Sequence, residues 1–127
     1  MEKTEVRTDK APNPVGPYSQ AIIAGDFIFC SGQIAINPWT GTLVNDDIET
    51  ETTQVMENLG AVLEASGSSF YKIVKTTIYL LNMSNFSKVN EVYGKYFADA
   101  PPARATVQVS KLPKGANVEI ECIALIN

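Results

Sequence analysis

Apolar and polar residues follow a strand-like pattern near the start of the chain. Two apolar runs, at positions 21–24 and 27–30, flank Gly25 and Asp26, a pair that is typical of a tight β-hairpin turn. A second turn signal, with one proline and one glycine, precedes a short apolar run at 42–44. The pattern therefore predicts a three-stranded meander before the first helix.

Helical spacing of apolar residues is clearest between Glu49 and Ser66, and Gly67 stands where a helix commonly ends. A second helix is predicted after Ser84, which serves as its N-cap. Between the two helices, the β-branched run at 72–81 predicts a central strand that is buried on much of both faces. The apolar stripes are Val55, Leu59, Val62 and Leu63 in the first helix, and Phe86, Val89, Tyr93 and Phe97 in the second.

Two more strands are predicted at 104–109 and 117–126, with a turn between them. In the first of these strands Arg104 points to the same side as the other polar residues, because side chains alternate along a strand. In the second, Glu119 and Glu121 point away from the core. We expect a sheet face that mixes carboxylates, arginine and aliphatic side chains and that is buried against a second subunit. Ile123 and Leu125 continue this face.

The predicted order is three strands, a helix, a strand, a helix and two strands. This order is typical of an α+β domain with a mixed sheet and two helices packed on one face. The length of 127 residues and the 45% hydrophobic content fit a single domain spanning 1–127, with 1–17 as an N-terminal arm. The start of the chain lacks a basic leader with a long apolar run, so we expect a cytoplasmic protein that does not enter a membrane.

The composition narrows the possible chemistry. A net charge of −4, with ten basic residues scattered singly, argues against nucleic acid as a partner. The chain has no histidine, so it lacks the usual general base and the commonest metal ligand, and no spacing suggests a metal site. Cys30 and Cys122 lie in apolar runs and are interpreted as buried small hydrophobic residues. An enzyme of this composition must use carboxylates, hydroxyls, backbone groups and arginine.

Several motifs, taken together, resemble one known family. They are GPYSQA at 16–21, SGQI at 31–34, VNEVY at 89–93, PPAR at 101–104 and LPKGANVEIECIAL at 112–125. In this order they are similar to the RidA (YjgF) family of reactive-intermediate deaminases, and the resemblance covers essentially the whole chain.

The resemblance implies a fold, an assembly and an activity. The protomer is expected to have the chorismate-mutase-like order β-β-β-α-β-α-β-β. Three copies are expected to form a homotrimer whose sheets make a central barrel, with ligand sites between subunits. Active members hydrolyse 2-imino acids and their enamine tautomers, such as 2-aminoacrylate, 2-iminopropanoate and 2-iminobutanoate, to 2-keto acids and ammonia, and they use no cofactor.

The resemblance also implies roles for two charged residues. The arginine of the family's PxR motif falls on Arg104, where its planar guanidinium would bind the substrate carboxylate. The alternative is a salt bridge across a subunit interface to Glu119 or Glu121. The family's catalytic-site glutamate falls on Glu119, which would orient or partly deprotonate the attacking water. Glu121 is either a structural partner or exchanges this role with Glu119.

The remaining site residues come from the family motifs in the same way. Tyr18 would wall the pocket, Ser31 and Gly32 would approach the ligand, and Asn90 would face the cleft. Their alternative roles are ordinary ones: aromatic packing, a strand end and a polar helix position. Thr106 departs from the family pattern, because many members carry cysteine there. Thiol chemistry cannot be carried over to this position, although threonine keeps a hydroxyl near the ligand.

Two other functions compete with imine hydrolysis. A trimeric regulator could bind a small carboxylate without turnover, and Arg104 would serve it equally well. A pure carboxylate binder gains nothing from Glu119 near its ligand, because like charges repel. Endoribonuclease activity, reported within the family, fits poorly with an acidic chain that has no histidine and no phosphate-binding patch.

Overall fold

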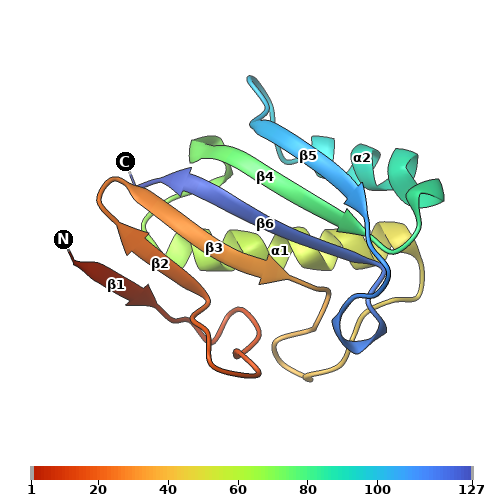
Figure 1. Ribbon diagram of the computed structural model, residues 1–127, viewed down its shortest axis with the longest axis horizontal. Coiled ribbons are helices and arrows are strands. Elements are labelled where there is room, and N and C mark those ends of the chain that lie inside the picture. Colours follow the sequence, from red (N-terminus) through yellow and green to blue (C-terminus); the bar gives the residue numbers. More distant parts are fainter. Residues whose placement is uncertain (1, 127) are drawn as a thin grey trace.

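Within residues 2–126, the part of the chain that the computed structural model describes, six strands form one sheet in the order β1-β2-β3-β6-β4-β5 (Figure 1). Neighbouring strands are antiparallel except for β4 and β5, which are parallel. The predicted α+β class and mixed sheet are therefore confirmed. The strands are β1 (Lys3–Val6), β2 (Ala21–Ala24), β3 (Phe27–Gln33), β4 (Ile73–Leu80), β5 (Ala103–Gln108) and β6 (Val118–Leu125).

The first strand of the sheet, β1, is formed by the N-terminal arm, where no strand was predicted. β1 pairs with β2 and supplies hydrogen-bond partners along an edge that would otherwise be open. The predicted strand at 42–44 is wrong, since only an isolated bridge joins Leu43 to Ile36. A tight turn explains this, because Asn37 donates to the Thr42 carbonyl at 2.9 Å and accepts from the Gly41 amide at 2.8 Å.

Helix α1 (Ile48–Ala65) begins and ends at sequence signals. The Asp47 side chain accepts a hydrogen bond of 2.7 Å from the Thr50 amide, which caps the first turn. At the other end Gly67 has a φ of 80°, and the Ser68 amide donates to the Leu63 carbonyl at 2.9 Å. This is the Schellman arrangement, in which a glycine takes the left-handed conformation after the helix.

Helix α2 (Phe86–Gly94) is shorter than predicted. Ser84 does not cap it, because Ser84 lies inside a 3₁₀ turn (Met83–Asn85) and donates its amide to the Asn82 side chain at 2.9 Å. Phe97 lies beyond the helix, but its ring still contacts Tyr93 with 4.8 Å between centroids. Phe97 therefore packs against Tyr93, its neighbour in the predicted apolar stripe, although it lies beyond the end of α2.

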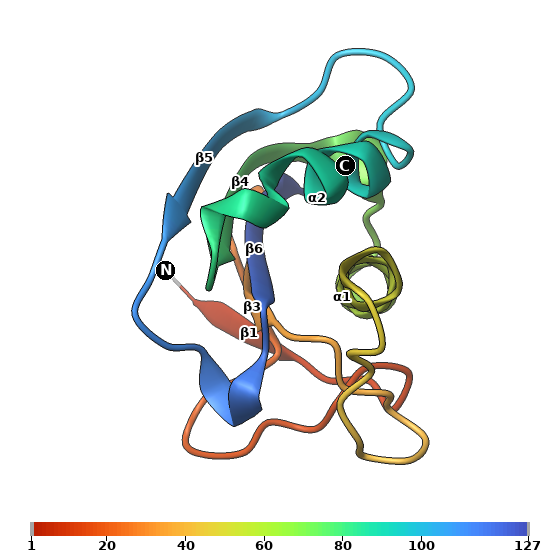
Figure 2. The same ribbon diagram turned by 90° about the vertical axis from the view of Figure 1, so that its right-hand side faces the viewer.

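Both helices cover the same face of the sheet (Figure 2). Side chains such as Ile78, Leu80 and Ile120 are fully buried against them and form the core. The opposite face stays open: Phe27, Phe29, Val107 and Leu125 are each at least 36% exposed. The prediction that β4 is buried on both faces is thus wrong for a single copy of the chain. No helix in the described part of the chain has the length and apolar character needed to span a membrane.

Candidate functional site

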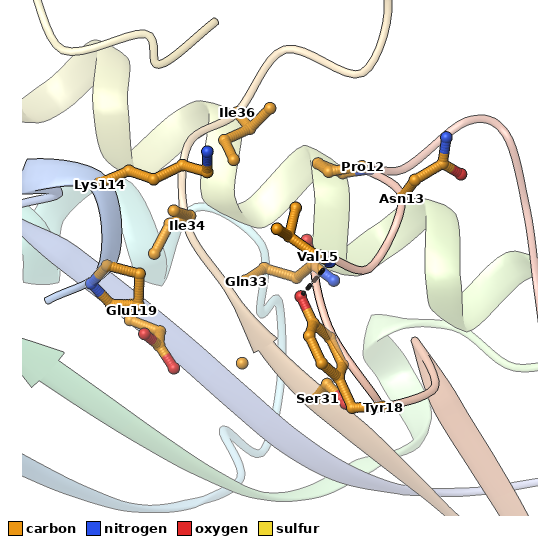
Figure 3. Close-up of a pocket in the computed structure, with 12 residues that line it drawn as sticks. Pro12, Asn13, Val15, Tyr18, Ser31, Gln33, Ile34, Ile36, Lys114 and Glu119 are labelled. Carbon is orange, nitrogen blue, oxygen red and sulfur yellow. Dashed lines mark hydrogen bonds between the residues drawn. The ribbon is translucent and has the colours of Figure 1, made fainter. Parts of the chain in front are cut away.

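One cleft of about 480 Å³ gathers Tyr18, Ser31, Gly32 and Glu119 (Figure 3). These residues come from the segment between the N-terminal arm and β2, from β3 and from β6, so the sheet brings together positions about a hundred residues apart in the sequence. The remaining predicted site residues, Arg104, Asn90 and Thr106, do not line this cleft.

A bulge in β3 shapes the wall of the cleft. Cys30 pairs with Cys122 and Gln33 pairs with Ile120, so two residues of β3 face the single residue between these partners on β6. The second bulged residue is Gly32. A Cβ atom added there would overlap Oε2 of Glu119 and lie 2.9 Å from its Cδ. A side chain at position 32 would therefore force the carboxyl group of Glu119 to move, because that group packs directly against the bulged backbone.

The Glu119 carboxyl group binds its proton more tightly than an ordinary glutamate does. Partial burial in the cleft raises its pKa above the usual value of 4.5, and the nearby charge of Glu121 raises it further. Both residues point to the open face of the sheet, where Glu119 lies opposite Tyr79 on β4. A carboxyl group with a raised pKa in a cleft is suited to proton transfer.

Hydrogen bonds fix the opposite wall to β3. The Ser31 hydroxyl donates to the Ser19 carbonyl at 2.6 Å, and the Ser31 amide donates to the Gln20 carbonyl at 2.9 Å. The buried side-chain amide of Gln20 in turn donates from Nε2 to the backbone carbonyls of Thr8 at 3.0 Å and Pro12 at 2.9 Å. The Ser31 proton is thus already used within the chain, and a ligand would meet only its remaining acceptor capacity.

Two features beside the cleft have no distinctive signal in the sequence. Lys114 lines it and has a φ of 56°, a left-handed conformation that is uncommon for a residue with a Cβ atom. Glu51, fully buried at the start of α1, accepts hydrogen bonds from the backbone amide of Asn117 at 2.7 Å and from its side chain at 2.8 Å. These two hydrogen bonds fix the turn that carries Lys114 and the start of β6, the strand that carries Glu119. Nothing in the helical pattern distinguished Glu51 from a solvated charge.

Arg104 lies in a second cluster, on edge strand β5 next to α2. Its Nη1 atom donates to Oδ1 of Asn90 at 2.6 Å. Its Cζ atom lies 5.3 Å from the centroid of the Tyr93 ring and 5.6 Å from that of Phe86. These distances are typical of cation–π contacts. The structure thus places Arg104 beside Asn90, and it adds two aromatic residues that the sequence pattern assigned only to an apolar stripe.

Thr106 lies two residues after Arg104 on the same face of β5. Its Oγ1 atom is buried and has no hydrogen-bond partner among residues 2–126. A buried hydroxyl without a partner is uncommon and costs free energy. Within the same part of the chain, no group of three or more Cys, Asp or Glu side chains is placed to bind a metal ion.

The two clusters lie on opposite faces of the sheet, which corrects the predicted mixed face. Arg104 pairs with Thr76 and Thr106 with Ile78, and both β4 partners are buried on the helix side. Glu119 points to the other side. In addition, β6, which carries Glu119, lies two strand spacings from β5, about 10 Å across the sheet. A single copy of the chain therefore cannot bring Arg104 and the Glu119 cleft together on one ligand.

Comparison with known proteins identifies the family. The family model described as Endoribonuclease L-PSP matches residues 8–126. The Reactive Intermediate Deaminase A of Arabidopsis thaliana is 48% identical over 99% of this chain and 67% of its own, and the human 2-iminobutanoate/2-iminopropanoate deaminase is 44% identical over 94% and 88%. The solved structure of E. coli TdcF with bound serine is 36% identical, covers 96% of this chain and 98% of its own, and superposes with a TM-score of 0.92. The chain belongs to the RidA family, which also carries the description Endoribonuclease L-PSP.

Proposed function

We propose that this protein hydrolyses 2-imino acids and their enamine tautomers to 2-keto acids and ammonia, at a site completed by two copies of the chain. The observation that carries this proposal is the division of the charged groups between two faces. The cleft of Glu119 has no arginine and only the single ammonium group of Lys114 as a cation, and the arginine cluster lacks an acid that could activate water. The names of the Arabidopsis and human relatives support the reaction.

Arg104 binds the substrate carboxylate in this proposal. The contacts with Asn90, Phe86 and Tyr93 limit the motion of the guanidinium, so little rotamer freedom is lost when the carboxylate binds. Charge-assisted hydrogen bonds from a guanidinium to a carboxylate are among the strongest in proteins.

Glu119 acts as the general base for the attacking water molecule and then as the general acid for the leaving ammonia. Its carboxylate accepts one proton as the water oxygen bonds to the imine carbon, and it passes that proton to the nitrogen. It then accepts the remaining proton from the new hydroxyl group as the carbonyl forms and the carbon–nitrogen bond breaks, and it gives this proton to the nitrogen, which leaves as ammonia. The products are a 2-keto acid and ammonia, so no oxidant or cofactor is needed. The raised pKa makes Glu119 a stronger base than an ordinary carboxylate.

The open face of the sheet is the surface on which copies meet. It carries the exposed aromatic rings of Phe27 and Phe29, 6.4 Å apart between centroids, together with Leu125 and Val107. Apolar side chains gathered on one face favour burial against another protein surface. We propose a homotrimer in which these faces pack together, so that the β5 edge of one copy lies beside the cleft of the next.

The test is a coupled assay in which threonine dehydratase generates 2-iminobutanoate and semicarbazide traps what survives. Wild-type protein should accelerate release of the keto acid, and Arg104→Ala should lower kcat/KM by about 100-fold, the loss expected when a buried carboxylate loses a charged partner. Glu119→Gln should abolish most of the remaining acceleration. Arg7→Ala and Glu64→Gln change exposed residues of the same types and should leave the rate unchanged.

The competing function is a trimeric regulator that binds a small carboxylate without turnover. It is favoured by the serine bound in the TdcF structure, an amino acid that carries a carboxylate. Calorimetric binding of 2-oxobutanoate by wild-type protein without any acceleration of imine hydrolysis would replace our proposal with this one. In that case the first variant to test is Thr106→Cys, which introduces the cysteine that many family members carry at this position.

A further inference from the structure

The side chains around Arg104 form a closed set of contacts, which we call the Arg104 brace and define as Thr76, Phe86, Asn90 and Tyr93. Three of them lie on α2 at spacings of four and three residues, so they share one face of the helix. Thr76 lies on β4 and is the direct strand partner of Arg104. An arginine on an edge strand is normally free to move, so this set of contacts needs an explanation.

Tyr93 connects the brace to the core. It is only 5% exposed, and its hydroxyl shares a hydrogen bond of 2.8 Å with Oγ1 of Thr76, which is 1% exposed. The face of the Tyr93 ring then contacts the Arg104 guanidinium, whose Cζ atom lies over the ring. Arg104 is therefore held twice by the same pair of residues: its backbone pairs with Thr76, and its side chain contacts Tyr93, which is hydrogen-bonded to Thr76.

The electrostatics agree with a neutral tyrosine in this position. Burial raises the pKa of Tyr93 above its usual value of 10, although the Thr76 hydrogen bond and the positive charge of Arg104 each act to lower it. The phenol consequently keeps its proton at neutral pH and offers a neutral ring face to the cation. Phe86 contacts the same guanidinium but has no polar atom that could fix its own position.

We propose that Tyr93, held by the hydroxyl of Thr76, is a positioning residue that sets the orientation of the Arg104 guanidinium for an incoming carboxylate. Asn90 fixes one nitrogen of the guanidinium, and the Tyr93 ring fixes its plane. The hydrogen bond to Thr76 fixes Tyr93. The part of this inference that concerns the carboxylate rests on the proposed function, whereas the part that concerns the order of the Arg104 side chain does not.

Two matched pairs of variants test the brace. Thr76→Val removes the hydroxyl while keeping the shape, and Thr76→Ser keeps the hydroxyl. Tyr93→Phe removes the phenol oxygen but leaves the ring, and Tyr96→Phe is its control because the Tyr96 hydroxyl binds Glu57 at 2.9 Å, away from Arg104. Thermal unfolding of all four variants reports any general loss of stability.

The first measurement is nuclear magnetic resonance of the arginine Nε–Hε groups. The chain has two arginines, Arg7 and Arg104, so the Arg104 signal is identified by its absence in Arg104→Lys. We expect a narrow, slowly exchanging signal in the wild type, in Thr76→Ser and in Tyr96→Phe. In Thr76→Val and Tyr93→Phe the signal should broaden or exchange faster with water.

The second measurement separates KM from kcat in the imine assay. Loss of the hydrogen bond should raise KM about fivefold in Thr76→Val and Tyr93→Phe, with a smaller change in kcat, because carboxylate binding is weakened in ground state and transition state alike. Thr76→Ser should restore the wild-type KM. A KM and an Arg104 signal that stay at wild-type values in Thr76→Val and Tyr93→Phe, even with lower thermal stability, would overturn the proposal.

Failure of the proposed function gives a different result. If wild-type protein neither hydrolyses the imine nor binds 2-oxobutanoate, the function is wrong, and the resonance measurement still decides whether Thr76 and Tyr93 order Arg104. Broadening in Thr76→Val with recovery in Thr76→Ser supports the positioning role by itself. An unchanged Arg104 signal in all four variants refutes it.

Discussion

At the scale of residues, Glu119 and Gly32 depend on each other. The bulge in β3 places the backbone of Gly32 against the carboxyl group of Glu119, and any side chain at position 32 would displace it. The same closeness removes water from Glu119 and contributes to its raised pKa. The bulge thus acts on the chemistry of the cleft as well as on its shape.

The raised pKa predicts a shifted pH dependence. Because Glu119 must be ionised to accept a proton from water, kcat/KM should fall on the acid side with an apparent pKa above the ordinary 4.5. Glu121→Gln removes a negative charge that raises this pKa, so the acid limb should move to lower pH. A pH–rate profile of the imine assay measures both.

Glu64→Gln is the control for this profile, since Glu64 is exposed on α1 far along the sequence from the cleft residues. Its acid limb should coincide with that of the wild type. An acid limb that stays in place in Glu121→Gln would show that Glu121 does not act on Glu119 electrostatically.

At the scale of elements, α1 packs closely enough to require a glycine in its interior. A Cβ atom added at Gly60 would lie 2.8 Å from Cε2 and 2.9 Å from Cζ of Phe70. The Phe70 ring cannot easily move, because it is packed against Tyr96 and Phe97 with centroids 5.0 and 6.1 Å away. The aromatic cluster therefore fixes the distance between α1 and the chain before β4.

Two helical glycines should respond in opposite directions to alanine. Overpacking in Gly60→Ala should lower the free energy of unfolding by about 1–3 kcal/mol. The higher helix propensity of alanine offsets about 1 kcal/mol of this loss. Gly94→Ala, with no atom within 4 Å of the added Cβ, should raise stability by about 0.5–1 kcal/mol. Urea unfolding of both variants checks this. Equal stabilisation by the two substitutions would contradict the packing of Phe70.

At the scale of the whole molecule, the open sheet face and the divided charged clusters lead to the same expectation. A lone copy exposes an apolar face and separates Arg104 from Glu119 by the thickness of the sheet and two strand spacings. Association through that face would bury the apolar surface. It would also give each cleft an arginine from a neighbour.

Mixed assemblies test this arrangement directly. Co-expression of Arg104→Ala chains with Glu119→Gln chains should restore about a quarter of wild-type activity in a randomly mixed trimer, because one interface in four then pairs an intact arginine with an intact glutamate. Each variant alone should stay inactive. Light scattering on the purified mixture gives the assembly size. A stable monomer, or mixtures as inactive as their parts, would place the site within one chain.

The sequence alone was informative where a signal is local. The hairpin at Gly25, the helix that ends before Gly67 and the strands at 73–80 and 118–125 follow from turn chemistry and periodicity. The predicted third strand failed, because the apolar run at 42–44 looks like a strand by itself. The side of β3 that it would have paired with is taken by β6, whereas β1 from the arm pairs with β2.

Local patterns in the sequence determined both helices with their buried faces and the strands that follow them, and family motifs supplied the candidate residues of the site. Only the tertiary structure decided that Arg104 and Glu119 lie on opposite faces, because that depends on the register of β5 on β4 and of β6 on both of its neighbours. The bulge at Gly32 and the contact of Tyr93 with Arg104 were decided in the same way. Each joins residues distant in sequence, and side-chain alternation within one strand carries no information about which strand lies beside it.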